Sequence, residues 1–322
     1  MKLLLTPLLA SWVAAKVLWT RLWRGPAHPR WSLSAELVLR VTQRLVAVLH
    51  DDMTTLKRVS QYGQLSPRMR QRVRVEAGSL GGMPVEEHHP RNARGPTLLY
   101  FHGGGYVVCN PASHRELVAQ MAWSCGTRAL ALDYRKAPEA PWPAALEDAL
   151  AAIAALREQG VTDLWLAGDS AGGGLAVCSM VAMKQRGLEP VRGAILLSPW
   201  IDLTEAGRDP ALDSDLDYLS SRELTLYSDA YVQKANASDP TISPIYADLA
   251  GLPPQFVSAG SAETLCEQAE RYIARCRAAG SPVERLVHEG MWHVYPMFSM
   301  LLPEGREALK AIGAWVRSGE DA

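Results

Sequence analysis

Short apolar runs that alternate with helical segments constrain the fold of this chain more than any other feature. Five such runs are typical of strands buried on both faces, and a sixth strand is expected at 283–288; the runs are 97–101, 129–132, 164–167, 194–197 and 255–258. Most segments between them repeat apolar residues every three or four positions, which predicts helices. Strands joined by helices run parallel, so the pattern predicts an α/β protein with a mostly parallel sheet covered on both faces.

The segment before residue 97 predicts further elements. Val73 and Val75 alternate with charged residues, as in a strand with one wet face, and a second strand at 83–87 would pair with it antiparallel. The sheet is therefore expected to have eight strands. Helical periodicity over residues 31–58 and a polar insertion after Leu203 predict a helical cap. We assign residues 1–60 and about 203–235 to this cap and residues 61–322 to the α/β domain.

Composition excludes some classes of function. The formal net charge of −1 and the isoelectric point near 6.7 give no electrostatic basis for binding nucleic acid. The cysteines are odd in number and match no zinc or redox spacing, so no metal is expected and a reducing cytoplasm is the expected location. They are Cys109, Cys125, Cys178, Cys266 and Cys276.

The first 24 residues are apolar, but charged residues and a proline interrupt them, so no run reaches the length of a membrane-spanning helix. Trp12, Trp19 and Trp23 fall on one apolar helix face. This stripe is compatible with a lid over an active site, which we favour. It is also compatible with a cleaved export signal or with a helix lying on a membrane surface.

A serine in a Gly-rich turn is the first candidate for chemistry. The stretch Gly168-Asp169-Ser170-Ala171-Gly172 lies between the apolar run 164–167 and a segment with helical periodicity. Glycines let the chain turn sharply and leave the Ser170 hydroxyl exposed, and the next helix directs its N-terminus at developing negative charge. The stretch therefore predicts a nucleophile elbow.

A serine hydroxyl needs a base and a set of donors before it can act as a nucleophile. The stretch His102-Gly103-Gly104-Gly105 directly follows the predicted strand 97–101, and its glycines would expose backbone N–H groups to an oxyanion. Among eight histidines, His293 lies just after the last predicted strand, at the sheet edge where α/β proteins assemble their sites. His293 is therefore the predicted general base.

The acid that orients this base is expected between the serine and the histidine in chain order. No aspartate occurs in residues 250–320, so an acid after the strand 255–258 must be a glutamate. Glu263 lies on the turn that follows this strand and is the preferred candidate. Glu267 is the alternative, and we expect it to form a capping box with Thr264 at the start of the next helix.

Together these motifs resemble the hormone-sensitive-lipase-like family of α/β-hydrolase esterases. The resemblance extends over about residues 96–296 and rests on six stretches, which are His102–Gly105, Asp133–Glu139, Pro141–Ala145 with Asp148, Gly168–Gly172, Ser198–Leu203 and Gly290–His293. Two departures stand out, because the family usually has Asp at Glu263 and Leu at Lys136.

The resemblance implies an α/β-hydrolase fold with a helical cap over the acyl pocket. It implies hydrolysis of carboxylic esters through an acyl-enzyme, without a cofactor. It also implies that the N–H groups of Gly103, Gly104 and Ala171 form the oxyanion hole.

The expected substrates are small-molecule esters with short or medium acyl chains, cleaved by a triad of Ser170, His293 and Glu263. Alternatives on the same site are lactone hydrolysis, acyl transfer to an alcohol, and a non-catalytic small-molecule receptor. An exposed final strand is compatible with a homodimer. Membrane contact through the N-terminal helix is an alternative that we do not favour.

Overall fold

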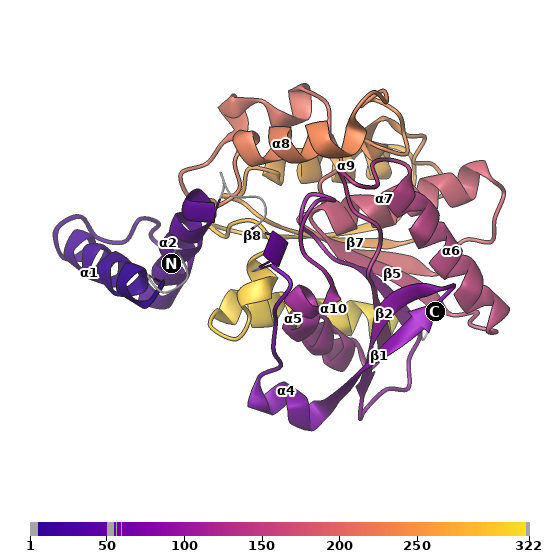
Figure 1. Cartoon of the computed structure of the whole chain (residues 1–322), viewed down its shortest axis with the longest axis horizontal. Coiled ribbons are helices and arrows are strands. Elements are labelled where there is room, and N and C mark those ends of the chain that lie inside the picture. Colours follow the sequence, from indigo (N-terminus) through magenta and orange to yellow (C-terminus); the bar gives the residue numbers. More distant parts are fainter. Residues whose placement is uncertain (1–5, 50–54, 56, 59, 320–322) are drawn as a thin grey trace.

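The computed structural model describes residues 6–49, 55, 57–58 and 60–319 (Figure 1). Eight strands form one sheet in the order β1-β2-β4-β3-β5-β6-β7-β8. Their bounds are β1 Val73–Leu80, β2 Met83–Pro90, β3 Thr97–Phe101, β4 Arg128–Leu132, β5 Leu164–Asp169, β6 Gly193–Leu197, β7 Gln255–Gly260 and β8 Val283–His288. Only the β1–β2 and β2–β4 pairs are antiparallel, so the predicted eight-stranded, mostly parallel sheet is confirmed.

Helices cover both faces of the sheet because successive side chains of its central strands point to opposite sides. In β3, Leu98 and Tyr100 pack with α5 (Pro111–Cys125) and α10 (Pro303–Ser318). Leu99 and Phe101 belong to the larger core on the other face. That core is covered by α6 (Ala144–Glu158), α7 (Ala171–Gln185) and α9 (Cys266–Ala278).

Parallel register brings the ends of the central strands to one edge. Phe101 at the end of β3 lies beside Gly168 in β5, and Leu197 in β6 lies between Asp169 and Ser258 of its two neighbours. The loops that follow these strands therefore leave the sheet side by side.

The insertion after β6 is built of short elements. Two 3₁₀ turns, η2 (Ala206–Arg208) and η3 (Pro210–Leu212), precede α8 (Ser221–Val232). Ser220 and Glu223 form a capping box at the start of α8, which satisfies N–H groups that a helix leaves unpaired. The short helix α4 (Pro67–Arg72) and the turns η4 (Pro244–Tyr246) and η5 (Tyr295–Phe298) complete the named elements.

Helices α1 (Thr6–Arg24) and α2 (Leu33–Leu49) form a hairpin that projects from the sheet domain (Figure 1). The connection between the two helices is anchored to the sheet domain, because Trp31 is buried against Trp292 and its Nε1 donates to Gly290 O at 2.7 Å. Gln43 Nε2 donates to Asp217 O at 2.6 Å. Within the described part of the chain, no helix has both the length and the hydropathy needed to cross a bilayer.

The anchoring of the hairpin predicts a difference between two of its tryptophans. Trp31→Ala should lower the free energy of unfolding by about 3–5 kcal/mol, because it empties a buried site and removes the bond to Gly290. Trp23→Ala, at a site 73 % exposed, should change it by no more than about 0.5 kcal/mol. Urea denaturation measures both, and equal losses would contradict the anchoring.

Candidate active site

Ser170 occupies the sharp turn between β5 and α7. Its φ of 53° and ψ of −122° lie in a region that residues with side chains rarely adopt. The turn is held in place because Ser170 N–H donates to Leu197 O at 2.8 Å and Ser170 O accepts from Trp200 N–H at 2.9 Å. A Cβ on Gly172 would lie 2.0 Å from Phe101 O, so only glycine fits there. The structure thus contains the turn that the sequence predicts.

Ser170 and His293 line one cavity of about 200 Å³, together with Gly104 and Gly105. Its apolar wall comes from α2, from the insertion and from η5, through Val46, Leu219, Leu224, Tyr227 and Met297. The structure therefore brings the predicted nucleophile and base together. None of the described residues of α1 lines the cavity, so the favoured lid role for the tryptophan stripe conflicts with this structure. Residues 1–5 of the predicted cap lie outside the described residues.

His293 follows β8 in a loop that is held through its backbone. Its N–H donates to Asp217 Oδ1 at 3.1 Å, and the N–H of Val294 donates to Ser198 Oγ at 3.0 Å. The ring lies edge-on to Tyr218, with centroids 5.8 Å apart. Burial lowers the pKa of His293 to about 4, although the charge of Asp169 opposes this shift. The imidazole is thus neutral near pH 7, which is the form that accepts a proton.

Glu263 is buried on the turn after β7. Its Oε2 accepts from Ser198 Oγ at 2.7 Å and from Gly260 N–H at 3.0 Å. Burial raises the pKa of Glu263 to about 8, and these hydrogen bonds oppose the rise. Among the described residues, Glu263 Oε1 and His293 Nδ1 are both buried without a hydrogen-bond partner. An acceptor and a potential donor therefore remain unused, and Ser198 links the two segments that carry them.

The predicted capping box at Thr264 and Glu267 is wrong. α9 begins at Cys266, and no side chain caps it through a hydrogen bond. Thr264 Oγ1 instead donates to Leu219 O at 2.7 Å, which ties the turn of Glu263 to the insertion. Glu267 is exposed to solvent, so Glu263 is the buried acid of the two.

Asp217 in the insertion was not predicted as a site residue. Its carboxylate accepts from the backbone N–H groups of Tyr218 (2.7 Å), Thr264 (2.8 Å) and His293 (3.1 Å). Burial nevertheless raises its pKa to about 6. Asp217 thus joins the insertion to the turns of both Glu263 and His293. The sequence shows it only as one of several aspartates in a polar stretch, which gives no signal of this role.

The hydrogen bonds that Asp169 accepts change the set of predicted oxyanion donors. Its Oδ1 accepts from Gly103 N–H at 2.9 Å and from Tyr100 OH at 2.6 Å. The Gly103 N–H is therefore occupied, and its assignment to the oxyanion hole conflicts with the structure. Gly104 and Gly105 line the cavity instead, and Gly105 could have been found because it belongs to the same glycine run.

A histidine pairs with the same carboxylate. His114 Nε2 lies 3.1 Å from Asp169 Oδ2, and Ser113 Oγ lies 2.8 Å from His114 Nδ1. Burial opposes ionisation of Asp169, but His114 and the hydrogen bonds from Tyr100 and Gly103 hold its pKa below the ordinary value. This network fixes the glycine loop to the elbow.

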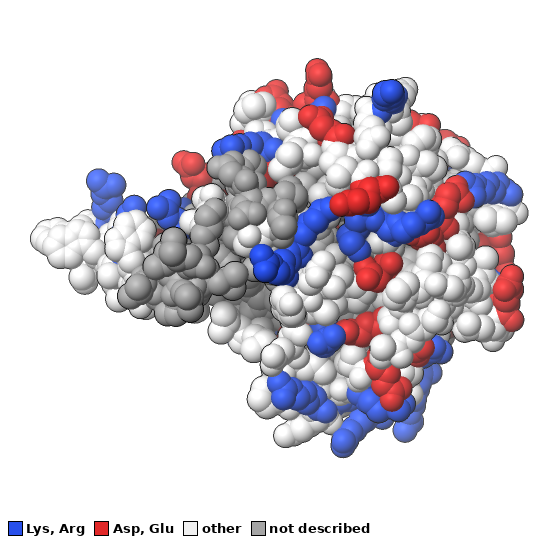
Figure 2. Space-filling model, viewed as in Figure 1, with Lys and Arg blue, Asp and Glu red and all other residues white. Residues whose placement is uncertain are grey.

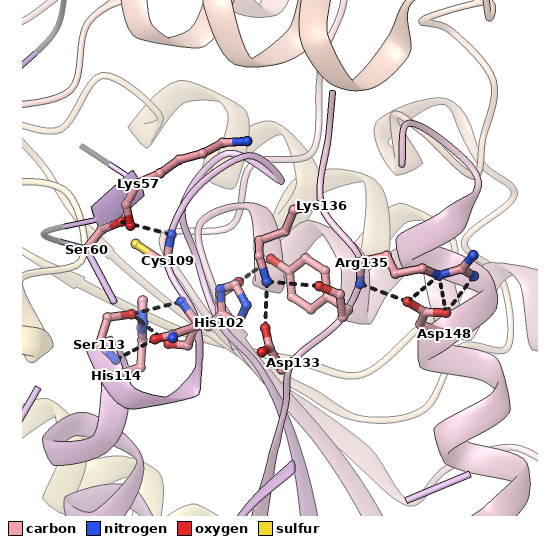
Figure 3. A network of polar contacts seen from close by, with 12 residues as sticks. Lys57, Ser60, His102, Cys109, Ser113, His114, Asp133, Arg135, Lys136 and Asp148 are labelled. Atoms are coloured by element: carbon pink, nitrogen blue, oxygen red, sulfur yellow. Dashed lines mark hydrogen bonds and ion pairs between the residues drawn. The ribbon is translucent and has the colours of Figure 1, made fainter. Parts of the chain in front are cut away.

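His102 shapes the glycine loop, as Figure 3 shows. Its Nδ1 lies 2.7 Å from Gly103 O, and its ring stacks on Tyr134 at 4.3 Å between centroids. Burial, with the charges of His114 and Lys136, lowers the pKa of His102 well below its usual range. Lys136, which replaces the family's leucine, donates to Asp133 Oδ1 at 2.5 Å and to Tyr134 O at 3.1 Å. No metal-binding cluster of His, Cys, Asp and Glu occurs among the described residues.

Known proteins share this architecture. Residues 98–297 match a family described as the alpha/beta hydrolase fold. An acetyl-hydrolase from Streptomyces hygroscopicus is 37 % identical over 243 residues, which are 74 % of this chain and 81 % of that protein. An esterase from Acinetobacter venetianus is 30 % identical over 250 residues, 76 % and 82 % of the two chains. A crystal structure of a hormone-sensitive-lipase homologue from a metagenome library has a TM-score of 0.80 at 33 % identity, covering 88 % of this chain and 98 % of that chain.

The sheet order, the serine turn and the glycine loop are those of an α/β hydrolase. The chain belongs to the hormone-sensitive-lipase-like family of α/β-hydrolase esterases. It is a carboxylic-ester hydrolase of the serine-hydrolase type. The family and the reaction class predicted from the sequence are confirmed.

The raised pKa of Glu263 predicts a pH-dependent effect on stability. The folded protein holds this proton up to about pH 8, whereas the ordinary value is 4.5, so the contribution of Glu263 to stability falls as the pH rises through that window. Glutamine cannot ionise. Glu263→Gln should therefore match the wild type near pH 4 and exceed it near pH 9 by on the order of 2–4 kcal/mol in free energy of unfolding.

The control is Glu267→Gln, because Glu267 is exposed. The difference in free energy of unfolding between Glu267→Gln and the wild type should stay constant with pH. Urea denaturation across the pH range measures all three proteins. A difference between Glu263→Gln and the wild type that does not change with pH would contradict burial of an ionisable Glu263.

Proposed function

We propose that this esterase cleaves short-chain acyl esters by nucleophilic attack of Ser170, with His293 as general base and Glu263 as the acid that orients it. The observation that carries this proposal is the shared cavity, in which Ser170 and a neutral His293 face the same space beside Gly104 and Gly105. A neutral imidazole beside a serine hydroxyl supplies the base that the hydroxyl needs.

The reaction proceeds in two halves. His293 Nε2 takes the Ser170 proton as Oγ attacks the ester carbonyl, and the N–H groups of Gly104, Gly105 and Ala171 stabilise the oxyanion. Ala171 is the first residue of α7, where N–H groups have no partner within the helix. Collapse of the intermediate passes the proton from His293 to the departing alcohol and leaves an acyl-Ser170. Water, deprotonated by His293, then releases the carboxylic acid and restores Ser170.

Glu263 acts when His293 becomes charged. Burial favours a neutral His293 and a protonated Glu263 in the resting site, so Glu263 releases its proton to solvent before Ser170 attacks. Ionised Glu263 stabilises the imidazolium formed during the attack, and its unused Oε1 is available to accept from Nδ1–H. The carboxylate therefore favours the transition state more than the resting state.

A short acyl chain fits the size and lining of the cavity. About 200 Å³ is below the roughly 300–1,000 Å³ of pockets for drug-sized ligands, and the wall residues Leu224, Tyr227 and Met297 are largely apolar. A relative described as an acetyl-hydrolase supports the same choice. Lactones and acyl transfer to alcohols use the same acyl-enzyme, so product analysis separates them from hydrolysis of open-chain esters.

The cap is also part of the proposal. α2 supplies Val46 to the cavity wall, and the insertion supplies Leu219, Leu224 and Tyr227. We assign these two segments to the cap over the acyl site. β8 is an edge strand of the sheet, which supports its proposed use in a homodimer, and a cytoplasmic location remains a prediction from the sequence.

The triad assignment predicts how single substitutions change activity. Ser170→Ala should lower kcat for p-nitrophenyl acetate by about 10⁴-fold or more and abolish the acyl adduct seen by mass spectrometry. Glu263→Gln should lower kcat by about 10²–10⁴-fold with a folded protein, because the imidazolium loses its partner. The controls Ser318→Ala and Glu267→Gln should keep wild-type rates. Retained turnover in Ser170→Ala, or a larger loss in Glu267→Gln than in Glu263→Gln, would overturn the assignment.

The cavity wall predicts the acyl preference. Tyr227 lies so close to Gly105 that a Cβ on that glycine would be 2.3 Å from its ring. Tyr227→Ala should enlarge the acyl side and raise the ratio of kcat/KM for hexanoate over acetate esters by about tenfold, as a few buried methylene groups allow. Tyr62→Ala, at a site 76 % exposed, should leave the ratio unchanged. An unchanged ratio in Tyr227→Ala would contradict the proposed acyl site.

A further inference from the structure

Helix α1 presents its apolar face to solvent. Val13 and Val17 are buried, whereas the opposite face carries five large apolar side chains that are 48–80 % exposed. At about 100° per residue these five lie within an arc of about 140°, and they are Trp12, Leu18, Trp19, Leu22 and Trp23. Scattered exposed apolar residues are normal, but a contiguous patch marks a surface that meets a partner.

Basic side chains border this patch. Residues 6–49 contain six Lys and Arg residues and one acidic residue, Glu36, although the whole chain has a net charge of −1. Glu36 is paired with Arg21 at 2.8 Å. Beside the patch, Lys16 Nζ lies 5.4 Å and Arg44 Cζ 5.8 Å from the centre of the Trp12 ring. Figure 2 shows white atoms at the outer end of the α1–α2 hairpin, with blue Lys and Arg side chains beside them.

A groove between α1 and α2 extends the basic region. It has a volume of about 600 Å³, and the charged side chains along it are mostly cationic. They are Lys16, Arg24, Arg40 and Arg44, with Glu36 as the acidic exception. Trp12 belongs to the exposed patch and also lines this groove, so the basic side chains of the groove adjoin one edge of the patch.

From these features we propose that α1 docks on the surface of an anionic lipid bilayer, with its exposed tryptophans and leucines at the boundary between headgroups and acyl chains. Tryptophan favours this boundary, and basic side chains beside it attract anionic headgroups. A second copy of this chain is a poorer partner, because two strongly basic hairpins repel each other. The helix lies on the bilayer and does not cross it.

The anchoring of α2 makes the contact relevant to the whole protein. Trp31, in the connection between α1 and α2, fixes the hairpin to Gly290, three residues before His293. None of the described residues of α1 lines the catalytic cavity, so docking on lipid leaves the described cavity lining intact. Attachment to a bilayer and hydrolysis of a soluble ester are therefore separable properties of this protein.

Cosedimentation of the full chain with vesicles tests the proposal. Vesicles of phosphatidylcholine with about 30 % phosphatidylglycerol should bind the protein at least about tenfold more tightly than pure phosphatidylcholine, and NaCl raised from about 0.1 M to 0.5 M should weaken that binding. The triple variant Trp19→Ala, Leu22→Ala and Trp23→Ala should lose about tenfold or more in affinity, yet hydrolyse p-nitrophenyl acetate at the wild-type rate.

Two matched controls sharpen the result. Met300→Ala with Leu301→Ala removes other exposed apolar side chains, 56 % and 57 % exposed, and should not change vesicle binding. Lys16→Glu should weaken binding several-fold, whereas Lys310→Glu on the exposed side of α10 should not.

Three outcomes would overturn the proposal. The triple variant could bind vesicles like the wild type. Binding of the wild type could be indifferent to phosphatidylglycerol and salt. Analytical ultracentrifugation could instead show a dimer that the triple variant dissociates, with no binding of the wild type to either vesicle, which would make a second copy of the chain the partner.

Discussion

A buried carboxylate without a neighbouring cation must find N–H or O–H donors, and this requirement holds the active site of this esterase together. Asp217 meets it with backbone N–H groups from three places in the chain, its own turn at Tyr218, the turn of Glu263 at Thr264, and the loop of His293. Loops that leave the sheet from different strands are thereby fixed relative to one another. Without such a shared acceptor, parallel register alone would bring these loops to one edge but would not align them.

Asp169 fixes separate segments of the chain to one another in the same way, on the side of the site that carries Ser170. It accepts from Tyr100 within the sheet, from Gly103 in the glycine loop and from His114 in α5, so the glycine loop is fixed to the elbow that carries Ser170. The pKa values of the two carboxylates shift in opposite directions, because His114 and two hydrogen bonds hold the pKa of Asp169 below its ordinary value, whereas burial raises the pKa of Asp217 to about 6. A charge that develops in the cavity during catalysis meets dipoles that these hydrogen bonds hold in place.

Sequence reasoning placed Ser170 and His293 correctly at one cavity because strand ends in a parallel sheet share an edge, and that rule depends only on the order of elements. It missed contacts that depend on tertiary packing. Gly103 and Gly105 are equivalent in the motif, and only the position of the Asp169 carboxylate shows that the first N–H is already used. Thr264 likewise has the spacing of a helix cap, but the insertion lies close enough for its hydroxyl to donate to Leu219 O.

The tryptophans of the N-terminal hairpin show the same limit of sequence reasoning, because their surroundings depend on tertiary packing. Periodicity places Trp19 and Trp23 on one apolar helix face without deciding what covers that face, and it predicts no contact for Trp31. The structure separates them, because Trp31 meets Trp292 and the carbonyl of Gly290, whereas Trp19 and Trp23 are mostly exposed, with their ring centroids 5.8 Å apart. Folding therefore explains the burial of Trp31 but not two exposed indoles on a basic helix. Their exposure is unfavourable in water, and an external apolar phase with anionic headgroups would remove that penalty.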